Sequence, residues 1–221
     1  MLRRTFLKVG VEVMLSTLLG KGAKTPVKIM PLGDSITSGY GHEGGYRIRL
    51  GALIEDATYD AVFVGSQENG PAGMRSRQHE GHDGWTIPQL AAPLNDWLQT
   101  QQPDIVLLHM GTNDLWEQFD VPATLVNLEN LIRQICAQVP QALVMVAAVI
   151  RADTGVKEYD KRIRLYGDVV PGLVWNLAGE GLQVVLTDMR NLGVATEDGV
   201  HPTAAGYDLM GEQWWIIMQG G

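Results

Sequence analysis

Residues 27–35 read Val-Lys-Ile-Met-Pro-Leu-Gly-Asp-Ser, an apolar run that stops at a Gly-Asp-Ser turn. Such a run is typical of a buried strand, so the Ser35 hydroxyl is expected at the carboxyl end of a sheet, where open α/β sheets bind their ligands. Near the other end of the chain, residues 198–202 read Asp-Gly-Val-His-Pro. A nucleophilic serine needs a base that a third group orients, and this short turn offers both in His201 and Asp198.

Alternating apolar segments and helical patterns predict the fold class. The segments that read as buried strands are Val27–Pro31, Ala61–Gly65, Asp104–Met110, Ala142–Ile150 and Gln183–Thr187. Most are continuous apolar runs, as strands covered on both faces of a parallel sheet are. Helical patterns separate them, at Tyr46–Ala57, Thr86–Thr100, Val121–Val139, Lys157–Gly179 and Thr203–Gln219, and Pro171 is expected to bend or split the fourth. The order predicts a three-layer α/β/α sandwich around a five-stranded parallel sheet with right-handed crossovers.

The segment Ser66–Gly84 shows no periodicity and is rich in Gly, Arg, His and Glu. We expect it to lack regular structure, and a stretch of that kind inside a compact domain is usually functional. It contains His79 and His82, which are expected to form a hydrogen-bonded pair that braces the Gly84 loop. The spacing of the two histidines is not that of a helical zinc motif, so no metal site is predicted.

Composition and charge restrict the partners of the chain. Its 221 residues carry 17 basic and 25 acidic side chains, a net charge of 17 − 25 = −8, which argues against nucleic acid or an anionic membrane as a partner. The single cysteine, Cys136, allows no intrachain disulfide and reads as a small core side chain. His109, at the end of a buried strand, reads as a core histidine with its hydrogen bonds satisfied.

The first residues differ from the rest. Arg3-Arg4-Thr5-Phe6-Leu7-Lys8 resembles a twin-arginine export signal, and the apolar run Val9–Leu19 follows it. Residues 1–26 are therefore predicted to be a signal or an N-terminal extension, and residues 27–221 the folded domain. Export to the periplasm or the exterior is expected, or a cytoplasmic location if the N-terminus is retained. The apolar run is too short to span a membrane.

Four polar blocks follow strand ends or precede helices in chain order. They are Gly33-Asp34-Ser35, His82–Thr86, Gly111–Asp114 and Asp198–His201. The carboxyl ends of parallel strands meet at one edge of a sheet, so the blocks are expected to gather there.

On these blocks the chain resembles the SGNH hydrolases, the GDSL esterase/lipase superfamily, whose four characteristic residues match Ser35, Gly84, Asn113 and His201. The resemblance implies a flavodoxin-like sheet and a serine esterase that needs no metal or cofactor. In the implied mechanism Ser35 is the nucleophile, His201 the base and Asp198 the group that orients the base. The Ser35 N–H, the Gly84 N–H and the Asn113 amide would form the oxyanion hole.

A narrower resemblance is to carbohydrate esterase family 3, which contains acetyl xylan esterases. It rests on the residue blocks Ile29–Thr37, Gly44–Arg47, Phe63–Ser66 and His79–Ile87. It implies removal of acetyl groups from a carbohydrate such as acetylated xylan. Asp34, Arg47 and Trp85 are expected to brace loops or to contact substrate.

Other functions remain open at this point. The chain could be a general short-chain esterase, or a lysophospholipase or thioesterase of the same superfamily. It could be an acyltransferase that uses the same Ser-His pair, or a carbohydrate-binding protein without catalytic activity. The expected partner is a small ester or an acetylated carbohydrate, and the sequence indicates no oligomeric state.

Overall fold

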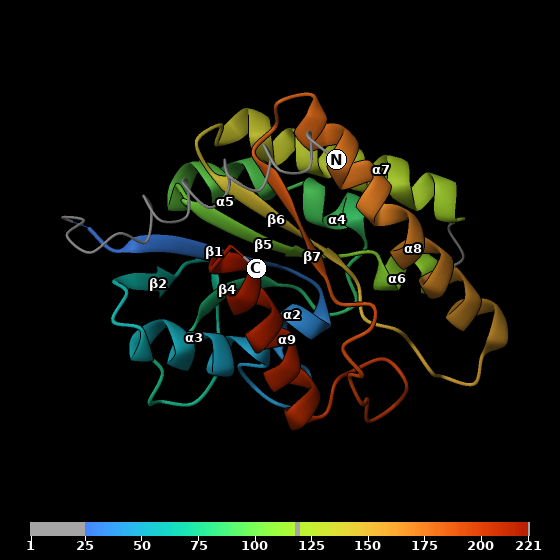
Figure 1. Cartoon of the computed structure of the whole chain (residues 1–221), viewed down its shortest axis with the longest axis horizontal. Coiled ribbons are helices and arrows are strands. Elements are labelled where there is room, and N and C mark those ends of the chain that lie inside the picture. The colour runs from blue at the N-terminus through green and yellow to red at the C-terminus, as the bar shows by residue number, and fades with distance from the viewer. Residues whose placement is uncertain (1–24, 118–119, 221) are drawn as a thin grey trace.

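The computed structural model describes residues 25–117 and 120–220. The predicted signal or extension, residues 1–26, therefore lies outside the described residues except for Thr25 and Pro26. A central sheet separates two layers of helices (Figure 1). The three-layer α/β/α architecture predicted from the sequence is confirmed.

Five parallel strands form the centre of the sheet. They are β1 (Val27–Gly33), β2 (Ala61–Phe63), β5 (Ile105–His109), β6 (Leu143–Ala148) and β7 (Val184–Asp188). Their spatial order, β2-β1-β5-β6-β7, is that of a flavodoxin-like sheet. Gly33 of β1 pairs with His109 of β5, so the two strands end at the same edge of the sheet. The Gly33-Asp34-Ser35 and Gly111–Asp114 blocks therefore lie at that edge.

The prediction of a five-stranded, wholly parallel sheet is wrong in one region, because the sheet has seven strands. The segment expected to lack regular structure contains β3 (Gln67–Glu68) and β4 (Gln78–Gly81), which pair antiparallel. β4 lies parallel to the carboxyl half of β1, beyond the half that pairs with β2. Two- and four-residue strands are too short to show a period, and the buried residues of β4 include the polar His79 and Glu80.

Helices cover both faces of the sheet (Figure 1). One face carries α3 (Tyr46–Asp56) and α9 (Ala204–Met218), which pack together with Trp214 and Met218 in their core. The other face carries α4 (Ile87–Ala91), α5 (Leu94–Gln101), α7 (Val121–Gln138) and α8 (Lys157–Gly179). Short helices α2 (Ser35–Ser38) and α6 (Thr112–Trp116) follow β1 and β5.

Prolines act differently in two of the predicted helices. The pattern over Thr86–Thr100 forms two helices, because Pro93, at the N-cap of α5, has no backbone N–H to donate. Pro171 does not split α8, which runs through it. Val170, Val174 and Leu177 bury this stretch of α8 in the core, and that packing offsets the lost hydrogen bond.

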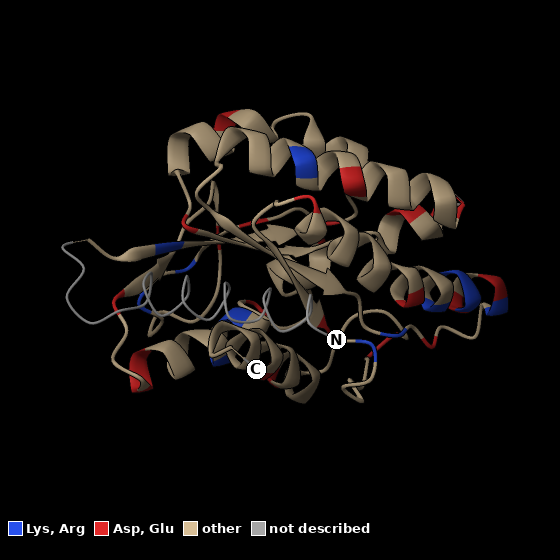
Figure 2. Cartoon of the chain, turned by 45° about the horizontal axis from the view of Figure 1, so that its top comes forward, with Lys and Arg blue, Asp and Glu red and all other residues tan. Residues whose placement is uncertain are grey.

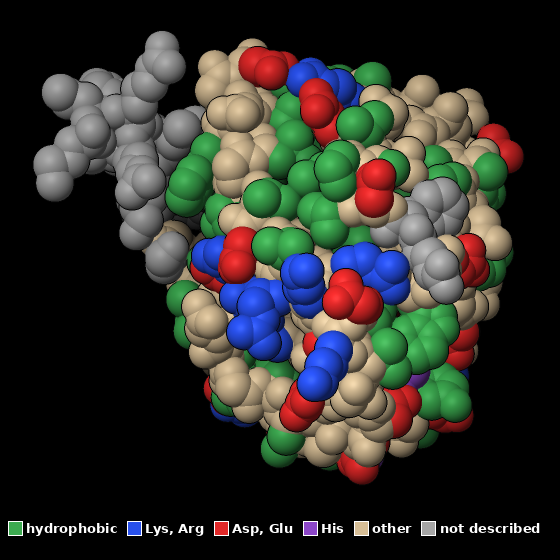
Figure 3. All heavy atoms as spheres, turned by 90° about the vertical axis from the view of Figure 1, so that its right-hand side faces the viewer, with side chains coloured by type: hydrophobic (Ala, Val, Ile, Leu, Met, Phe, Trp, Pro, Cys, Tyr) green, Lys and Arg blue, Asp and Glu red, His purple; other side chains and the backbone are tan. Residues whose placement is uncertain are grey.

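Charged side chains lie mainly on the outer helices and loops, whereas the central strands carry few of them (Figure 2). On the face that includes the start of α8, Lys and Arg gather in a band with acidic side chains among them (Figure 3). Arg190 pairs with Asp188, and Arg151 pairs with Asp168. None of the helices in residues 25–117 and 120–220 has both the length and the apolar character needed to cross a membrane.

His109 is buried, as expected, but its hydrogen bonds are not satisfied. Within the described part of the chain neither ring nitrogen has a partner. Burial lowers the pKa of His109 to about 4, so the ring stays neutral near pH 7.

Candidate active site

Ser35 begins a four-residue helix at the carboxyl end of β1 and is 6% exposed. Asp34 is the N-cap of this helix, and its Oδ1 accepts the Ile36 N–H at 3.0 Å. Gly33 allows the tight turn that precedes this helix, because a Cβ on residue 33 would collide with Thr37 Oγ1 and with the His109 carbonyl oxygen. The strand, the glycine and the cap together fix the direction of the serine.

Ser35, His201 and Asp198 form a continuous series of hydrogen bonds. Ser35 Oγ lies 2.9 Å from His201 Nε2, and His201 Nδ1 lies 2.7 Å from Asp198 Oδ2. The other carboxylate oxygen, Asp198 Oδ1, accepts the backbone N–H of His201 at 2.8 Å and of Val200 at 3.0 Å. The same turn that presents the imidazole therefore also holds the carboxylate.

The charge state of Asp198 fixes the tautomer of His201. Partial burial raises the pKa of Asp198, but the backbone N–H groups of His201 and Val200 and the His201 ring lower it to about 2. An ionised Asp198 accepts a hydrogen from His201 Nδ1, which leaves Nε2 free to accept the Ser35 hydroxyl hydrogen. This arrangement can activate a serine hydroxyl at neutral pH.

Tyr40 contacts the imidazole and was not identified from the sequence. Its ring centroid lies 4.4 Å from that of His201, at an interplanar angle of 36°. The Tyr40 carbonyl oxygen accepts the Tyr207 hydroxyl at 3.2 Å, which ties this loop to α9. Nothing local in the sequence marks Tyr40, because its neighbour His201 is 161 positions further along the chain.

The Gly84 loop is anchored to the strand that precedes Ser35. The His82 N–H donates to the Gly33 carbonyl oxygen at 3.0 Å, and the Trp85 N–H donates to the His82 carbonyl oxygen at 3.2 Å. Asp83 accepts the Ser38 hydroxyl. Gly84 itself adopts a left-handed φ of 76°, which favours glycine.

Asn113 lies in α6, after β5, and joins the same loop. Its Nδ2 donates to the Trp85 carbonyl oxygen at 2.9 Å. The neighbouring Asp114 accepts the Ile87 N–H, 3.0 Å from Oδ2, and is buried. Burial raises the pKa of Asp114 to about 6. Asn113 thus connects the Gly111–Asp114 block to the His82–Thr86 block, and Asp114 connects it to Ile87, the first residue of α4.

The expected hydrogen bond between His79 and His82 does not form. His82 Nε2 lies 2.9 Å from the buried Glu80 Oε2, and its ring stacks on Trp85, at a centroid distance of 4.3 Å, and on Trp97, at 4.7 Å. His79 Nδ1 accepts the Gly81 N–H at 3.0 Å. His79 lies within β4, whereas His82 follows its last residue, and the two rings have different partners. Of the two histidines, only His82 braces the Gly84 loop, through its contacts with Glu80 and Trp97. The sequence did not indicate these two contacts.

Arg47 is a brace within the fold. Its side chain is fully buried and donates to the carbonyl oxygens of Thr37, Ser38, Asn69 and Arg77, and to Asn69 Oδ1. Trp85, half-buried, stacks on His82. Asp34 caps α2. These three residues occupy positions that stabilise the loops around Ser35.

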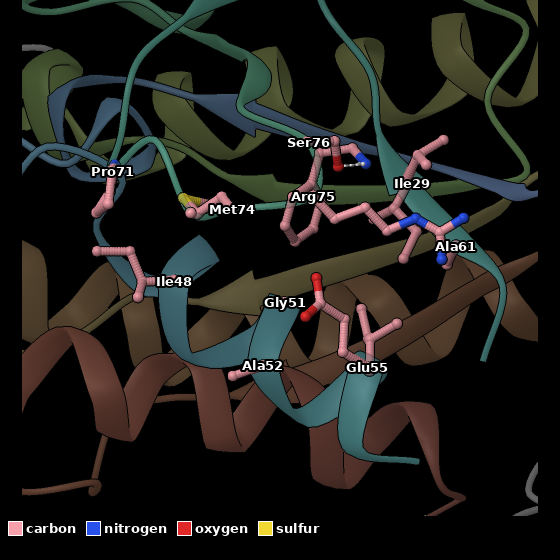
Figure 4. A pocket seen from close by; sticks show the side chains of 14 residues that line it. Ile29, Ile48, Gly51, Ala52, Glu55, Ala61, Pro71, Met74, Arg75 and Ser76 are labelled. Carbon is pink, nitrogen blue, oxygen red and sulfur yellow. Dashed lines mark hydrogen bonds between the residues drawn. The ribbon is translucent and has the colours of Figure 1, made fainter. Parts of the chain in front are cut away.

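A separate hollow of about 200 Å³ lies at the other end of the sheet (Figure 4). Its lining includes Ile29 and Ala61 near the amino ends of β1 and β2, and Met74 and Arg75 from the connection between β3 and β4. Ser35, Gly84, Asn113 and His201 do not line it. The described residues contain no cluster of three or more His, Cys, Asp or Glu side chains suited to a metal ion.

Comparisons with known proteins identify the family. The sequence matches the GDSL-like lipase/acylhydrolase family over residues 32–209. A multidomain esterase of Ruminococcus flavefaciens is 29% identical over 98% of this chain, which spans about a third (33%) of that relative's length. Among solved structures, a family 3 carbohydrate esterase of Clostridium thermocellum is 35% identical, with a TM-score of 0.77 over 88% of this chain and 98% of that one. An acetyl esterase crystallised with an acetate ion is 26% identical, with a TM-score of 0.74 over 87% of this chain and 98% of that one. The chain belongs to the GDSL-like lipase/acylhydrolase family of carboxylic ester hydrolases and resembles its family 3 carbohydrate esterases.

Proposed function

We propose that this chain is a serine esterase that hydrolyses short-chain acyl esters, above all acetyl esters, of carbohydrates such as acetylated xylan. The observation that carries the proposal is the series of hydrogen bonds from Ser35 Oγ to His201 Nε2 and from His201 Nδ1 to Asp198 Oδ2. This is the geometry that nucleophilic catalysis by a serine requires.

The reaction proceeds in two halves. Ser35 Oγ attacks the ester carbonyl carbon while His201 Nε2 takes the hydroxyl proton, and the imidazolium then gives that proton to the departing alcohol. A water molecule, deprotonated by the same nitrogen, then attacks the acyl-enzyme carbonyl, and the imidazolium returns that proton to Ser35 Oγ as the ester bond to the serine breaks and the carboxylic acid leaves. Asp198 stabilises the imidazolium that forms in each half.

The negative charge on the carbonyl oxygen needs hydrogen-bond donors fixed in advance. We assign this role to the Ser35 N–H, the Gly84 N–H and the Asn113 side-chain amide. Support comes from the hydrogen bonds that join the loops: His82 N–H to Gly33 O at 3.0 Å, and Asn113 Nδ2 to Trp85 O at 2.9 Å. Preorganised donors of this kind contribute about two to three orders of magnitude each to the rate.

The acyl group and the alcohol are inferred from relatives. The 35% identical structure is described as a family 3 carbohydrate esterase, and the 26% identical one as an acetyl esterase with an acetate ion. The alternative is a general short-chain esterase, or a lysophospholipase or thioesterase, of the same family. Acyl-chain length separates these activities, because an acetyl-specific site loses activity steeply beyond butyrate.

The test compares wild type with Ser35→Ala on acetylated xylan and on p-nitrophenyl esters from acetate to octanoate. We expect wild type to release acetate from xylan and to prefer the acetyl ester, and Ser35→Ala, shown to be folded by circular dichroism, to lose both activities. Undiminished ester cleavage by the variant would exclude Ser35 as the nucleophile. Good activity of wild type on the octanoyl ester would exclude the acetyl esterase.

We also propose that residues 27–221 are the catalytic domain and that residues 1–26 direct export. Support comes from the family match over residues 32–209 and from the pair Arg3-Arg4 ahead of an apolar run. Cell fractionation followed by N-terminal sequencing tests the second point. A mature protein outside the cytoplasm that still begins at Met1 would contradict removal of the segment.

A further inference from the structure

A polar cleft of about 340 Å³ lies beside the Gly84 loop. Asp83 and Trp85, which flank Gly84 in the sequence, line one side of it together with Ser38, which lies one helical turn after Ser35. The β3–β4 hairpin forms the other side, through Gln67, Glu68, Asn69, His79 and Gly81. The cleft is thus built from the same two segments that position the proposed nucleophile and the proposed oxyanion donor.

The most buried polar side chain in this lining has an unused hydrogen-bond donor. His79 is 2% exposed, and its Nδ1 accepts the Gly81 N–H at 3.0 Å, so in the neutral ring Nε2 carries the hydrogen. Burial, together with the nearby Arg47 and His82, lowers the pKa of His79 to about 3, which keeps the ring neutral near pH 7. His79 Nε2 has no hydrogen-bond partner among the residues the structure describes.

Hydrogen bonds within the protein join the two walls of the cleft. Arg47 donates to Ser38 O at 3.1 Å and to Arg77 O at 2.9 Å, and so links α2 to the hairpin. Asn69 Nδ2 donates to Ser38 O at 2.9 Å and makes the same connection from within the lining. A preformed cleft loses little conformational freedom when a ligand binds, which favours a specific binding site over a surface irregularity.

The chemistry of the lining suits an uncharged, hydroxyl-rich ligand. Gln67 and Asn69 are amides, Glu68 and Asp83 can accept hydroxyl hydrogens, and Trp85 adds an aromatic ring. The described residues that line the cleft include no Lys or Arg, Glu68 is paired with Arg77, and His82 contacts Glu80, so a carboxylate-bearing ligand would meet Asp83 without a lysine or arginine from the lining. A fatty acyl chain would find few apolar contacts here.

We propose that this cleft is a subsite for an uncharged sugar residue of the substrate, with His79 Nε2–H donating to a sugar oxygen. The proposal rests on the esterase function proposed above and adds the residues that recognise the carbohydrate. In it, His79 binds the sugar and takes no part in breaking the ester bond.

A substrate pair tests the subsite, because p-nitrophenyl acetate has no sugar and an acetylated xylo-oligosaccharide does. In His79→Asn, the side-chain carbonyl can take the place of Nδ1 and accept the Gly81 N–H, but no N–H remains at the Nε2 position. His79→Gln restores a donor near that position. Gln67→Ala truncates an exposed side chain of the cleft, and Gln99→Ala, exposed on α5 outside the cleft, is the matched control.

The measured quantity is the ratio of kcat/KM on the oligosaccharide to kcat/KM on p-nitrophenyl acetate. We expect His79→Asn to lower this ratio about tenfold, the loss of one hydrogen bond, mainly through KM. Gln67→Ala should lower the ratio about threefold, His79→Gln should recover part of it and Gln99→Ala should leave it unchanged. If His79→Asn fails to fold, Gln67→Ala decides the question.

The outcomes separate the two proposals. An unchanged ratio in the folded cleft variants, with wild type active on both substrates, would overturn the subsite and leave the esterase function intact. Cleavage of p-nitrophenyl acetate alone by wild type would overturn the carbohydrate assignment and the subsite with it. A Ser35→Ala variant that remains active would overturn the mechanism instead.

Discussion

The side chain of Asn113 donates to the carbonyl oxygen of Trp85 across 2.9 Å, which joins the loop after β5 to the loop that carries Gly84. An amide nitrogen has two hydrogens, so this bond leaves the second free to face an oxyanion. The same bond orients the side chain. Asn113 therefore has a structural role that the structure shows and a proposed catalytic role that kinetics can separate from it.

Replacing Asn113 by alanine should lower kcat by about two to three orders of magnitude with little change in KM, because an oxyanion donor acts mainly in the transition state. Loss of the bond to Trp85 should cost only about 1 kcal/mol of unfolding free energy. Steady-state kinetics and urea unfolding measure the two effects. Asn95→Ala, which removes a surface hydrogen bond to Gln134, is the control. A variant that loses stability but keeps its kcat would leave Asn113 with the structural role alone.

Gly84 offers a comparison between two glycines of similar conformation. Gly84 has φ 76° and Gly155 has φ 77°, and a Cβ on either would meet nothing within 4 Å. Alanine should therefore cost each site about 1–2 kcal/mol of stability through the left-handed backbone alone. Alanine keeps the backbone N–H, but relaxation of its strained left-handed conformation would turn the peptide plane. Only Gly84→Ala should therefore also reduce kcat, by about tenfold, because only there is the N–H a proposed oxyanion donor whose direction matters. Equal kcat values for the two variants would count against that role.

The Asp198 carboxylate accepts hydrogen bonds both from backbone N–H groups of its own turn and from the His201 ring. Two substitutions distinguish the effects of these two kinds of contact. In Asp198→Asn the remaining oxygen can still accept the N–H groups of Val200 and His201, but the amide cannot accept from His201 Nδ1. We expect kcat to fall about 10⁴-fold with stability nearly retained. Asp198→Ala should lose both kcat and stability of the turn. Asp208→Asn, exposed on α9, should match wild type, and a small effect of Asp198→Asn on kcat would show that the Ser-His pair works without its acid.

Arg47→Lys should be strongly destabilising even though it keeps the charge. The guanidinium satisfies carbonyl oxygens from α2 and from the hairpin, and a lysine has neither the planar shape nor enough donors to reach both. We expect a loss of about 2–4 kcal/mol in urea unfolding. Arg49→Lys at the exposed pair with Glu212 should change stability by less than about 1 kcal/mol. A similar small effect at Arg47 would mean that the brace contributes little.

The features of the fold that could be predicted from the sequence are those that leave long, regular hydrophobic patterns. The five parallel strands, the bounds of α3 and α8, and the edge of the sheet at which Ser35, Asn113 and His201 meet could all be inferred from it. Strands β3 and β4 could not, because they are short and β4 buries His79 and Glu80, whose polarity hides the strand from any hydrophobic pattern.

The contacts that the sequence missed are those made between distant segments. Trp97 lies in a predicted helix, yet no local pattern indicates that it packs against the ring of His82. Arg47 could be interpreted as a brace or a substrate contact, and only the hairpin around it distinguishes the two. The expected pairing of His79 with His82 was wrong for the same reason. His79 accepts the Gly81 N–H and His82 contacts Glu80 within and beside a strand that the sequence pattern did not reveal.

The pH dependence of stability should report on Asp34. Burial raises the pKa of this carboxyl to about 7, against the opposing effects of the Ile36 N–H and His201. In the unfolded chain the group ionises near 3.8, so between about pH 4 and 7 the folded state holds a proton that the unfolded state has released. The contribution of Asp34 to stability is therefore fully present below pH 4 and is lost as the pH rises through 7, by at most about 1.4 kcal/mol per pH unit.

Asp34→Asn removes this titration and keeps an oxygen to accept the Ile36 N–H. We expect the stability of the variant relative to wild type, measured by urea unfolding, to rise between about pH 4 and 7, the window set by the two pKa values, and to level off above it. Asp114, whose pKa is raised to about 6, also makes the stability fall as the pH rises. His79 and His109, whose pKa values are lowered by burial, make the stability fall as the pH drops below 6.5. These groups are present in both proteins and cancel in the difference. A difference that stays constant across this range would show that Asp34 is ionised throughout it in the folded protein.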